Sequence, residues 1–112
     1  MEYTPHHWVI LNITSDTEPP VRKVFAGWTG GYLDGDSWKA SSGITSITEY
    51  EDCYLIDNHS GSRYICYKTA YGMTSYMREV YDNWLTQLYA DMKIEIDTQH
   101  IQDSVLGENI DP

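Results

Sequence analysis

Five short segments, most of them bounded by turn-forming residues, are predicted to be β-strands. They are residues 7–14, 21–28, 44–50, 53–57 and 63–69. Successive side chains of a strand point to opposite faces of a sheet, so the first segment places Trp8, Ile10 and Asn12 on one face and Val9, Leu11 and Ile13 on the other. Short connections rich in Pro, Ser, Gly and acidic residues follow several of these segments, and they favour antiparallel hairpins.

A different periodicity begins after Gly72. Apolar residues recur with the 3.6-residue period of an amphipathic helix, namely Tyr76, Met77, Val80, Tyr81, Trp84, Leu85, Leu88, Tyr89 and Met92. Thr74 or Ser75 is the expected N-cap. The pattern predicts one long helix over about residues 75–91, packed on one face of the sheet.

Strands followed by a single late helix, without βαβ alternation, predict the α+β class. The expected fold is an antiparallel sheet of about five strands with this helix on one face, in a single domain over residues 1–92. Residues 93–112 form an acidic C-terminal segment. Alternation over residues 93–97 favours a short final strand, and the polar remainder is expected to be frayed or ordered by a partner.

The stretch from Gly27 to Trp38 holds four glycines in nine residues, which predicts a loop. Aromatic and acidic side chains on such a loop suit a contact surface, because Trp and Tyr are frequent interface anchors. The predicted binding surface consists of Trp28, Tyr32, Asp34, Asp36 and Trp38. The alternative is that Trp28 and Trp38 close one end of the core.

The segment Asn58-His59-Ser60-Gly61 predicts a tight hairpin, in which Gly61 adopts a left-handed conformation. A three-residue loop places Cys53 opposite Tyr67 and puts Cys53 and Cys66 on opposite sides of the sheet. A four-residue loop makes the two cysteines face each other. Gly61 favours the three-residue loop, with two separate thiols.

Among the compositional properties, the net charge restricts the possible classes of binding partner most. The chain has 112 residues and a net charge of −10, with six acids and one base after residue 90. Such a field repels nucleic acid and anionic membranes and favours a basic protein partner. Neither a signal peptide nor an apolar stretch long enough for a membrane span is visible, so a cytoplasmic location is expected.

Gly35-Asp36-Ser37 and the later Asp97-Thr98-Gln99-His100 resemble the ends of the catalytic pattern of GDSL hydrolases. That resemblance implies Ser37 as nucleophile and His100 as base, oriented by Asp97. The intervening family blocks are missing, and a chain with one helix does not supply the parallel sheet with helices on both faces. The His and Cys residues lack zinc-ligand spacing, and we expect no metal and no cofactor.

Several segments resemble small uncharacterised proteins of tailed bacteriophages. They are residues 26–32 and 35–38, Ser42-Gly43-Ile44 and Ser60-Gly61-Ser62-x-Tyr64-x-Cys66, within about residues 8–72. The resemblance implies a bacterial cytosol and an accessory role during infection. Small proteins of this kind inhibit host machinery such as restriction or CRISPR complexes, some by imitating nucleic-acid charge.

The predicted function is therefore that of a non-enzymatic acidic binding protein that inhibits or redirects a host protein. One alternative is a self-associating module that pairs through an exposed tyrosine-rich sheet face, since ten of the 112 residues are Tyr. The other is a small hydrolase that uses Ser37 and His100. The acids show no regular spacing that matches phosphates along a duplex, which disfavours DNA mimicry.

Overall fold

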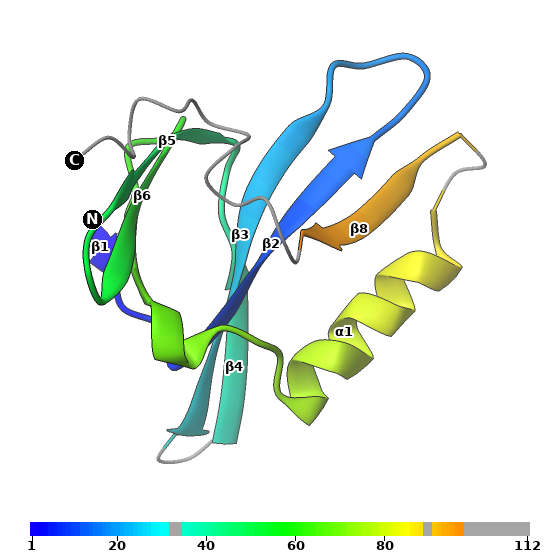
Figure 1. Ribbon diagram of the computed structural model, residues 1–112. Coiled ribbons are helices and arrows are strands. Elements are labelled where there is room, and N and C mark those ends of the chain that lie inside the picture. The colour runs from blue at the N-terminus through cyan, green and yellow to red at the C-terminus, as the bar shows by residue number, and fades with distance from the viewer. Residues whose placement is uncertain (32–34, 89–90, 98–112) are drawn as a thin grey trace.

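The computed structural model describes residues 1–31, 35–88 and 91–97. This part of the chain contains eight strands and one α-helix (Figure 1). The strands are β1 (Glu2–Tyr3), β2 (His7–Thr14), β3 (Val21–Gly31), β4 (Gly35–Ala40), β5 (Ile44–Glu49), β6 (Cys53–Asn58), β7 (Arg63–Tyr67) and β8 (Lys93–Asp97). Helix α1 spans Ser75–Thr86, and a 3₁₀ helix, η1, spans Lys68–Ala70.

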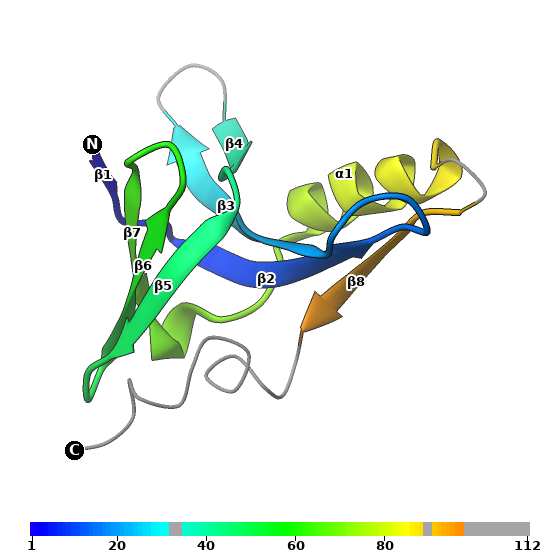
Figure 2. The same cartoon turned by 90° about the horizontal axis from the view of Figure 1, so that it is seen from above.

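The strands form two four-stranded sheets, so the expected α+β fold with one sheet of about five strands is wrong. Sheet A has the strand order β1-β7-β6-β5, and sheet B has the order β4-β3-β2-β8. Sheet A packs on one face of sheet B, and α1 lies on the other face (Figures 1 and 2). The described chain is therefore mostly β. The sequence pattern identified the strands but did not reveal that they divide between two sheets.

Sheet B is built on a long antiparallel hairpin of β2 and β3, whose register runs from His7 opposite Gly27 to Ile13 opposite Val21. Strand β8 returns from the end of the chain to pair with β2, and β4 pairs with β3 on the other side. Both pairings are antiparallel. The last described strand thus lies in the same sheet as the early hairpin of β2 and β3, whereas β1 belongs to sheet A.

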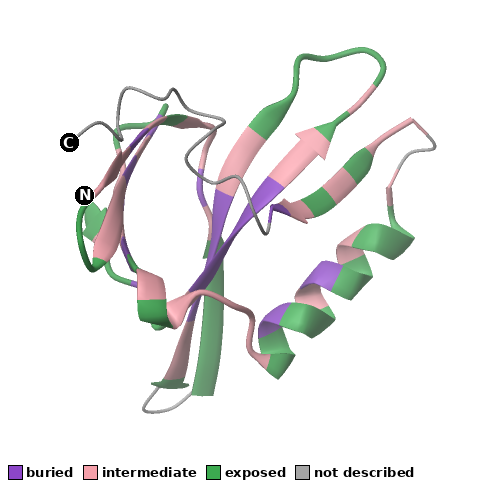
Figure 3. Cartoon of the chain, in the orientation of Figure 1, coloured by how far each residue is buried: buried purple, intermediate pink, exposed green. Residues whose placement is uncertain are grey.

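The middle of sheet B is buried on both faces, which explains why residues 8–11 are apolar without alternation. Figure 3 shows this burial along the middle of β2 and β3. The core between the sheets consists of Trp8, Ile10, Val24, Ala26, Ile47, Ile56, Tyr64 and Cys66. The core beneath the helix consists of Val9, Leu11, Phe25, Met77 and Tyr81.

Polar contacts fix β8 at the edge of sheet B. Asp97 is buried, and its Oδ2 lies 2.6 Å from Nη2 of Arg22 on β3. Arg22 Nε also donates a hydrogen bond of 3.0 Å to Asn12 Oδ1 on β2. The hydroxyl of Tyr71 donates to the main-chain oxygen of Asp97. The strand expected over residues 93–97 is present as β8, and these contacts join it to the two hairpin strands.

Helix α1 begins as expected but ends earlier than residue 91. Its N-cap is Thr74, whose Oγ1 accepts a hydrogen bond of 3.1 Å from the backbone N–H of Met77. At the other end, Thr86 Oγ1 donates to the carbonyl of Asn83, and the N–H of Gln87 donates to the carbonyl of Trp84. These bonds close the last turn in 3₁₀ fashion. Asn and Thr are weaker helix formers than Ala or Leu, and this local preference outweighs the apolar period.

The glycine-rich stretch is mostly strand, which corrects the expected loop over residues 27–38. Strand β3 continues to Gly31 and β4 begins at Gly35, with Trp28 paired to Ser37. The register shifts beyond this pair, and Gly30 and Gly35 adopt positive φ angles of 74° and 73°. The glycines therefore supply an irregular hairpin end rather than a long loop.

The hairpin between β6 and β7 confirms the three-residue loop. Gly61 has a φ of 94°, and Cys53 lies opposite Tyr67. Both cysteines are free thiols. Cys66 belongs to the core between the sheets, whereas Cys53 projects from the other side of sheet A.

Candidate functional site: an uncovered groove beside the helix

An apolar hollow lies on the face of sheet B that α1 only partly covers. In this register, β2, β3, β4 and β8 all direct alternate side chains toward the helix. The helix covers Val9 and Phe25 through Met77 and Tyr81. Because α1 ends at Thr86, the part of the sheet nearest the β2–β3 turn is left without a helix above it.

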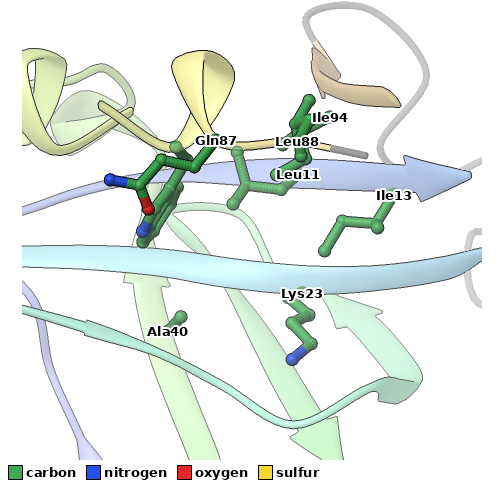
Figure 4. Close-up of a pocket in the computed structure, with 8 residues that line it drawn as sticks. Leu11, Ile13, Lys23, Ala40, Gln87, Leu88 and Ile94 are labelled. Atoms are coloured by element: carbon green, nitrogen blue, oxygen red, sulfur yellow. The ribbon is translucent and has the colours of Figure 1, made fainter. Parts of the chain in front are cut away.

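A cavity of about 310 Å³ occupies this uncovered part (Figure 4). Five of its lining residues are aliphatic or alanine, one is aromatic, and the polar ones are a lysine and a glutamine. They are Leu11, Ile13, Ala40, Leu88, Ile94, Trp84, Lys23 and Gln87. The cavity is therefore an apolar site with a single cation at its wall.

The cavity continues toward the tip of the β2–β3 hairpin. A second hollow of about 520 Å³ shares Ile13 and Lys23 with the first and reaches Glu18 and Asp91. A third, of about 340 Å³, shares Asp91 with the second and reaches Asp16. Because neighbouring hollows share lining residues, they adjoin one another, and the three together are called here the hairpin groove.

The hairpin groove is apolar at one end and acidic at the other. Trp84 lines the apolar end, and Asp16, Glu18 and Asp91 line the acidic end. Lys23 lies where the first two hollows meet, and the third hollow also includes Lys93. None of these five charged side chains forms an ion pair with another described residue, so their charges are available to a ligand.

Helix and sheet are held together at the groove by a buried tyrosine. The Tyr81 hydroxyl donates a hydrogen bond of 2.9 Å to the main-chain oxygen of Ile94 on β8. Burial raises the pKa of Tyr81 above its ordinary value, with smaller contributions from Glu95 and Asp82. The phenol therefore stays protonated at neutral pH and keeps Ile94 at the groove wall.

An aromatic cluster adjoins the apolar end. The ring of Trp38 on β4 packs edge-on against Trp84, with centroids 5.3 Å apart, and both rings pack against Phe25. Phe25 is fully buried, whereas Trp38 is 39% exposed. Trp38 therefore continues the apolar surface from the groove to the edge of sheet B.

The structure divides the surface that the sequence predicted. Trp38 lies on the helix side of sheet B, whereas Trp28 lies on the side of sheet A. Trp28 donates from Nε1 to the main-chain oxygen of Thr4 at 3.1 Å and packs edge-on against Tyr3. Trp28 is therefore part of the margin of the core, as the alternative interpretation had it.

Of the acidic members of that surface, Asp36 is exposed on the edge strand β4. Tyr32 and Asp34 lie outside the described residues. Among the described residues of the predicted surface, only Trp38 adjoins the hairpin groove, where it packs on Trp84. The residues that line the groove are ones for which the sequence predicted a core position or no site. Trp84 was counted in the helix stripe, and Ile13 and Lys23 in the hairpin. These three residues line an open site only because the helix ends early, and Asn83 and Thr86 are the sequence signals for that end.

The described residues provide no arrangement that supports the hydrolase interpretation. Ser37 is exposed on β4, His100 lies outside the described residues, and Asp97 is engaged with Arg22. Within residues 1–31, 35–88 and 91–97, no three His, Cys, Asp or Glu side chains gather as a metal site requires. The single α-helix found there is too short and too polar to span a bilayer.

Comparisons with known proteins gave no match. No protein-family model, no curated protein and no solved structure is significantly similar to this chain. The resemblance to small tailed-bacteriophage proteins therefore stays a prediction from the sequence.

Proposed function

We propose that this chain is a non-enzymatic protein-binding domain whose hairpin groove receives an apolar side chain of a partner protein, flanked by basic residues of that partner. The observation that carries this proposal is the apolar cavity that α1 leaves open between Trp84 and Ile13. Large apolar pockets with few polar groups are the usual place for ligands.

Burial of an apolar side chain supplies the affinity in this proposal. Transfer of one Leu- or Phe-sized side chain from water into such a site contributes about 1.5–3 kcal/mol. Trp84 and Trp38 add rigid aromatic surface beside it, and Trp is among the residues that most often dominate binding energy. The cavity therefore suits a single anchoring side chain rather than a broad flat contact.

Charge defines the rest of the partner. The acidic end of the groove, with Asp16, Glu18 and Asp91, favours Lys or Arg beside the anchor. The net charge of −10 steers a basic protein toward this domain and repels nucleic acid and anionic membranes. Because these carboxylates are at the surface, binding is expected to weaken as salt is raised.

The biological role that we propose is inhibition or redirection of a host protein by a phage accessory protein. It rests on the sequence resemblance alone, and host defence complexes with basic surfaces are the partners it suggests. The groove gives this role a chemical definition, namely an exposed apolar residue next to basic ones.

Selection of random peptides on the immobilised full chain tests the proposal. Enriched peptides are expected to share one large apolar residue with Lys or Arg within a few positions. Binding should be lost in Ala40→Arg, which places a cation in the cavity. Binding should persist in Ser37→Arg, which adds the same charge to the same strand but on the opposite face of the sheet.

Two results would overturn the proposal. One is a selection that enriches no motif, or a motif without basic residues. The other is a motif whose binding is equally strong with Ala40→Arg and with the parent chain, provided that circular dichroism shows both variants to be folded.

A further inference from the structure

A second surface, independent of the groove, lies on the face of sheet A that points away from sheet B. Ile56, Tyr64 and Cys66 on β6 and β7 face the core. Their neighbours in these strands project to the other side, which is called here the outer face. On β6 and β7 the outer face consists of Cys53, Leu55, Asp57, Arg63, Ile65 and Tyr67.

These six residues form three cross-strand rows. Leu55 lies opposite Ile65 in the central row, Asp57 opposite Arg63 on one side, and Cys53 opposite Tyr67 on the other. The central row is therefore apolar, the row of Asp57 and Arg63 is charged, and the row of Cys53 and Tyr67 is mixed. No described element covers them, and Tyr67 is 45% exposed.

The charged row is paired but accessible. Arg63 Nε lies 2.7 Å from Asp57 Oδ1, and the two side chains are 42% and 33% exposed. The hydrogen bond to Asp57 and the charge of Asp57 raise the pKa of Arg63, with a smaller contribution from Glu2. Asp57 and Arg63 together add no net charge to the outer face, and Glu2 on β1, in register with Arg63, adds one negative charge at its edge.

We propose that the outer face binds a second copy of this chain about a two-fold axis that runs parallel to the strands, between β6 and β7. Rotation about this axis leaves each residue at the same position along the strand direction. It places β6 of one copy over β7 of the other. Each residue then meets the copy of its own cross-strand neighbour. Leu55 faces Ile65 of the second copy, and Asp57 faces Arg63 of the second copy.

This arrangement is complementary at every row, as an isologous interface requires. Facing sheets pack about 10 Å apart and about 30° from parallel. The central row stays aligned under that rotation, and rows one step away shift by only about 3 Å, which the long side chain of Arg63 spans. Apolar residues meet in the centre, and opposite charges meet beside them.

Charge also favours a second copy here over contact elsewhere. Two chains with a net charge of −10 repel each other, so they can approach only where local charge cancels. Asp57 and Arg63 cancel on the outer face, and the neighbouring outward residues of β5, Ser46 and Thr48, are uncharged. Glu2 on β1 leaves one negative charge at the edge of this face, opposite β5 of the second copy. The acidic end of the hairpin groove offers no such balance.

The expected dimer is weak, because β6 and β7 are only six and five residues long. A contact of this size falls below the roughly 800 Å² per partner of a standard interface. Sedimentation equilibrium of the full chain from about 1 μM to about 1 mM covers the dissociation constants of weak and ordinary dimers. A rise from monomer to dimer mass within that range is the expected result.

Charge variants then test the axis itself. Asp57→Arg gives its charged row two cations, and Arg63→Asp gives its row two anions, so each variant alone should remain monomeric. An equimolar mixture should form dimers, because cations meet anions only across the interface. Recovery in the mixture does not arise from folding, since neither variant regains its own internal ion pair.

Three outcomes would overturn the proposal. They are a parent chain that stays monomeric at about 1 mM, single variants that dimerise as well as the parent, and a mixture that stays monomeric while both variants are folded. Ser37→Arg, on sheet B, is the matched control and should dimerise like the parent. All these outcomes are independent of whether peptides bind the hairpin groove.

Discussion

Replacing Gly27 with alanine measures how closely α1 packs on sheet B. Gly27 is buried in β3, beneath the side chain of Met77. A methyl group added there would lie 2.9 Å from Met77 Cγ and closer still to the sulfur, whereas carbon atoms in contact lie about 3.5–4.0 Å apart. Met77 is itself fully buried, so it cannot make room without moving its neighbours or the helix.

Overpacking of this kind costs about 1–3 kcal/mol of unfolding free energy. For a chain of this length each kcal/mol lowers the melting temperature by about 4 °C, so Gly27→Ala should melt about 4–12 °C below the parent. Urea unfolding followed by circular dichroism gives the free energy, and calorimetry gives the melting temperature.

A double-mutant cycle shows whether the loss arises at Met77. Met77→Ala alone leaves a cavity and should cost about 2–5 kcal/mol. In the double variant the new methyl group fills part of that cavity, so the combined loss should fall short of the sum by at least about 1 kcal/mol. Additive losses, or a Gly27→Ala variant as stable as the parent, would refute the close packing of α1 on this glycine.

Three further predictions concern buried polar groups. Asp97→Asn leaves Arg22 largely buried without its counter-charge and should lower the unfolding free energy by about 3 kcal/mol in urea titrations. Burial raises the pKa of Tyr64 from 10.0 to about 12, so the unfolded chain loses its proton first. The stability given by this phenol is complete below pH 10 and is lost as pH rises to about 12. Because burial also raises the pKa of Tyr71 to about 12, Tyr64→Phe should make urea midpoints fall less steeply over that range without removing the fall. A thiol reagent should modify Cys53 in the folded chain but Cys66 only after unfolding, because Cys66 is fully buried and burial raises its pKa.

Local patterns were sufficient for most strands and for one register. The apolar run within residues 7–14, followed by turn-forming residues, predicts β2 with the observed bounds. Gly61 alone distinguishes the three-residue hairpin from the four-residue one, because only a glycine adopts its φ of 94° without strain. Both features depend on residues that are close together in the sequence, so the sequence alone is enough to predict them.

Sheet membership depends on residues far apart in the chain and was not predicted. Strand β8 pairs with β2, which lies 79 residues earlier at their closest register pair, Thr14 with Lys93. Strand β1 pairs in parallel with β7. Alternation indicates that one face of a strand is buried but not which strand lies beside it. One sheet and two sheets are therefore equally compatible with the pattern.

The groove was missed for a related reason. An apolar period that continues to Met92 predicts a longer helix, and such a helix would cover Ile13 and Ile94. The helix ends at Thr86 because side-chain and 3₁₀ hydrogen bonds close its last turn. Leu88 and Met92, which lie beyond that end, then line hollows instead of a core. Trp38 was predicted at the site because of its aromatic character alone.

The indole N–H resonances of the four tryptophans give the most direct test of binding in the hairpin groove. In a ¹⁵N–¹H spectrum of the full chain, a selected peptide with an apolar anchor and basic neighbours should shift the indole signals of Trp84 and Trp38. The signals of Trp8 and Trp28, which lie on the other face of sheet B and donate to main-chain oxygens, should stay in place. Shifts confined to Trp28, or no shift at a saturating peptide concentration, would contradict the account.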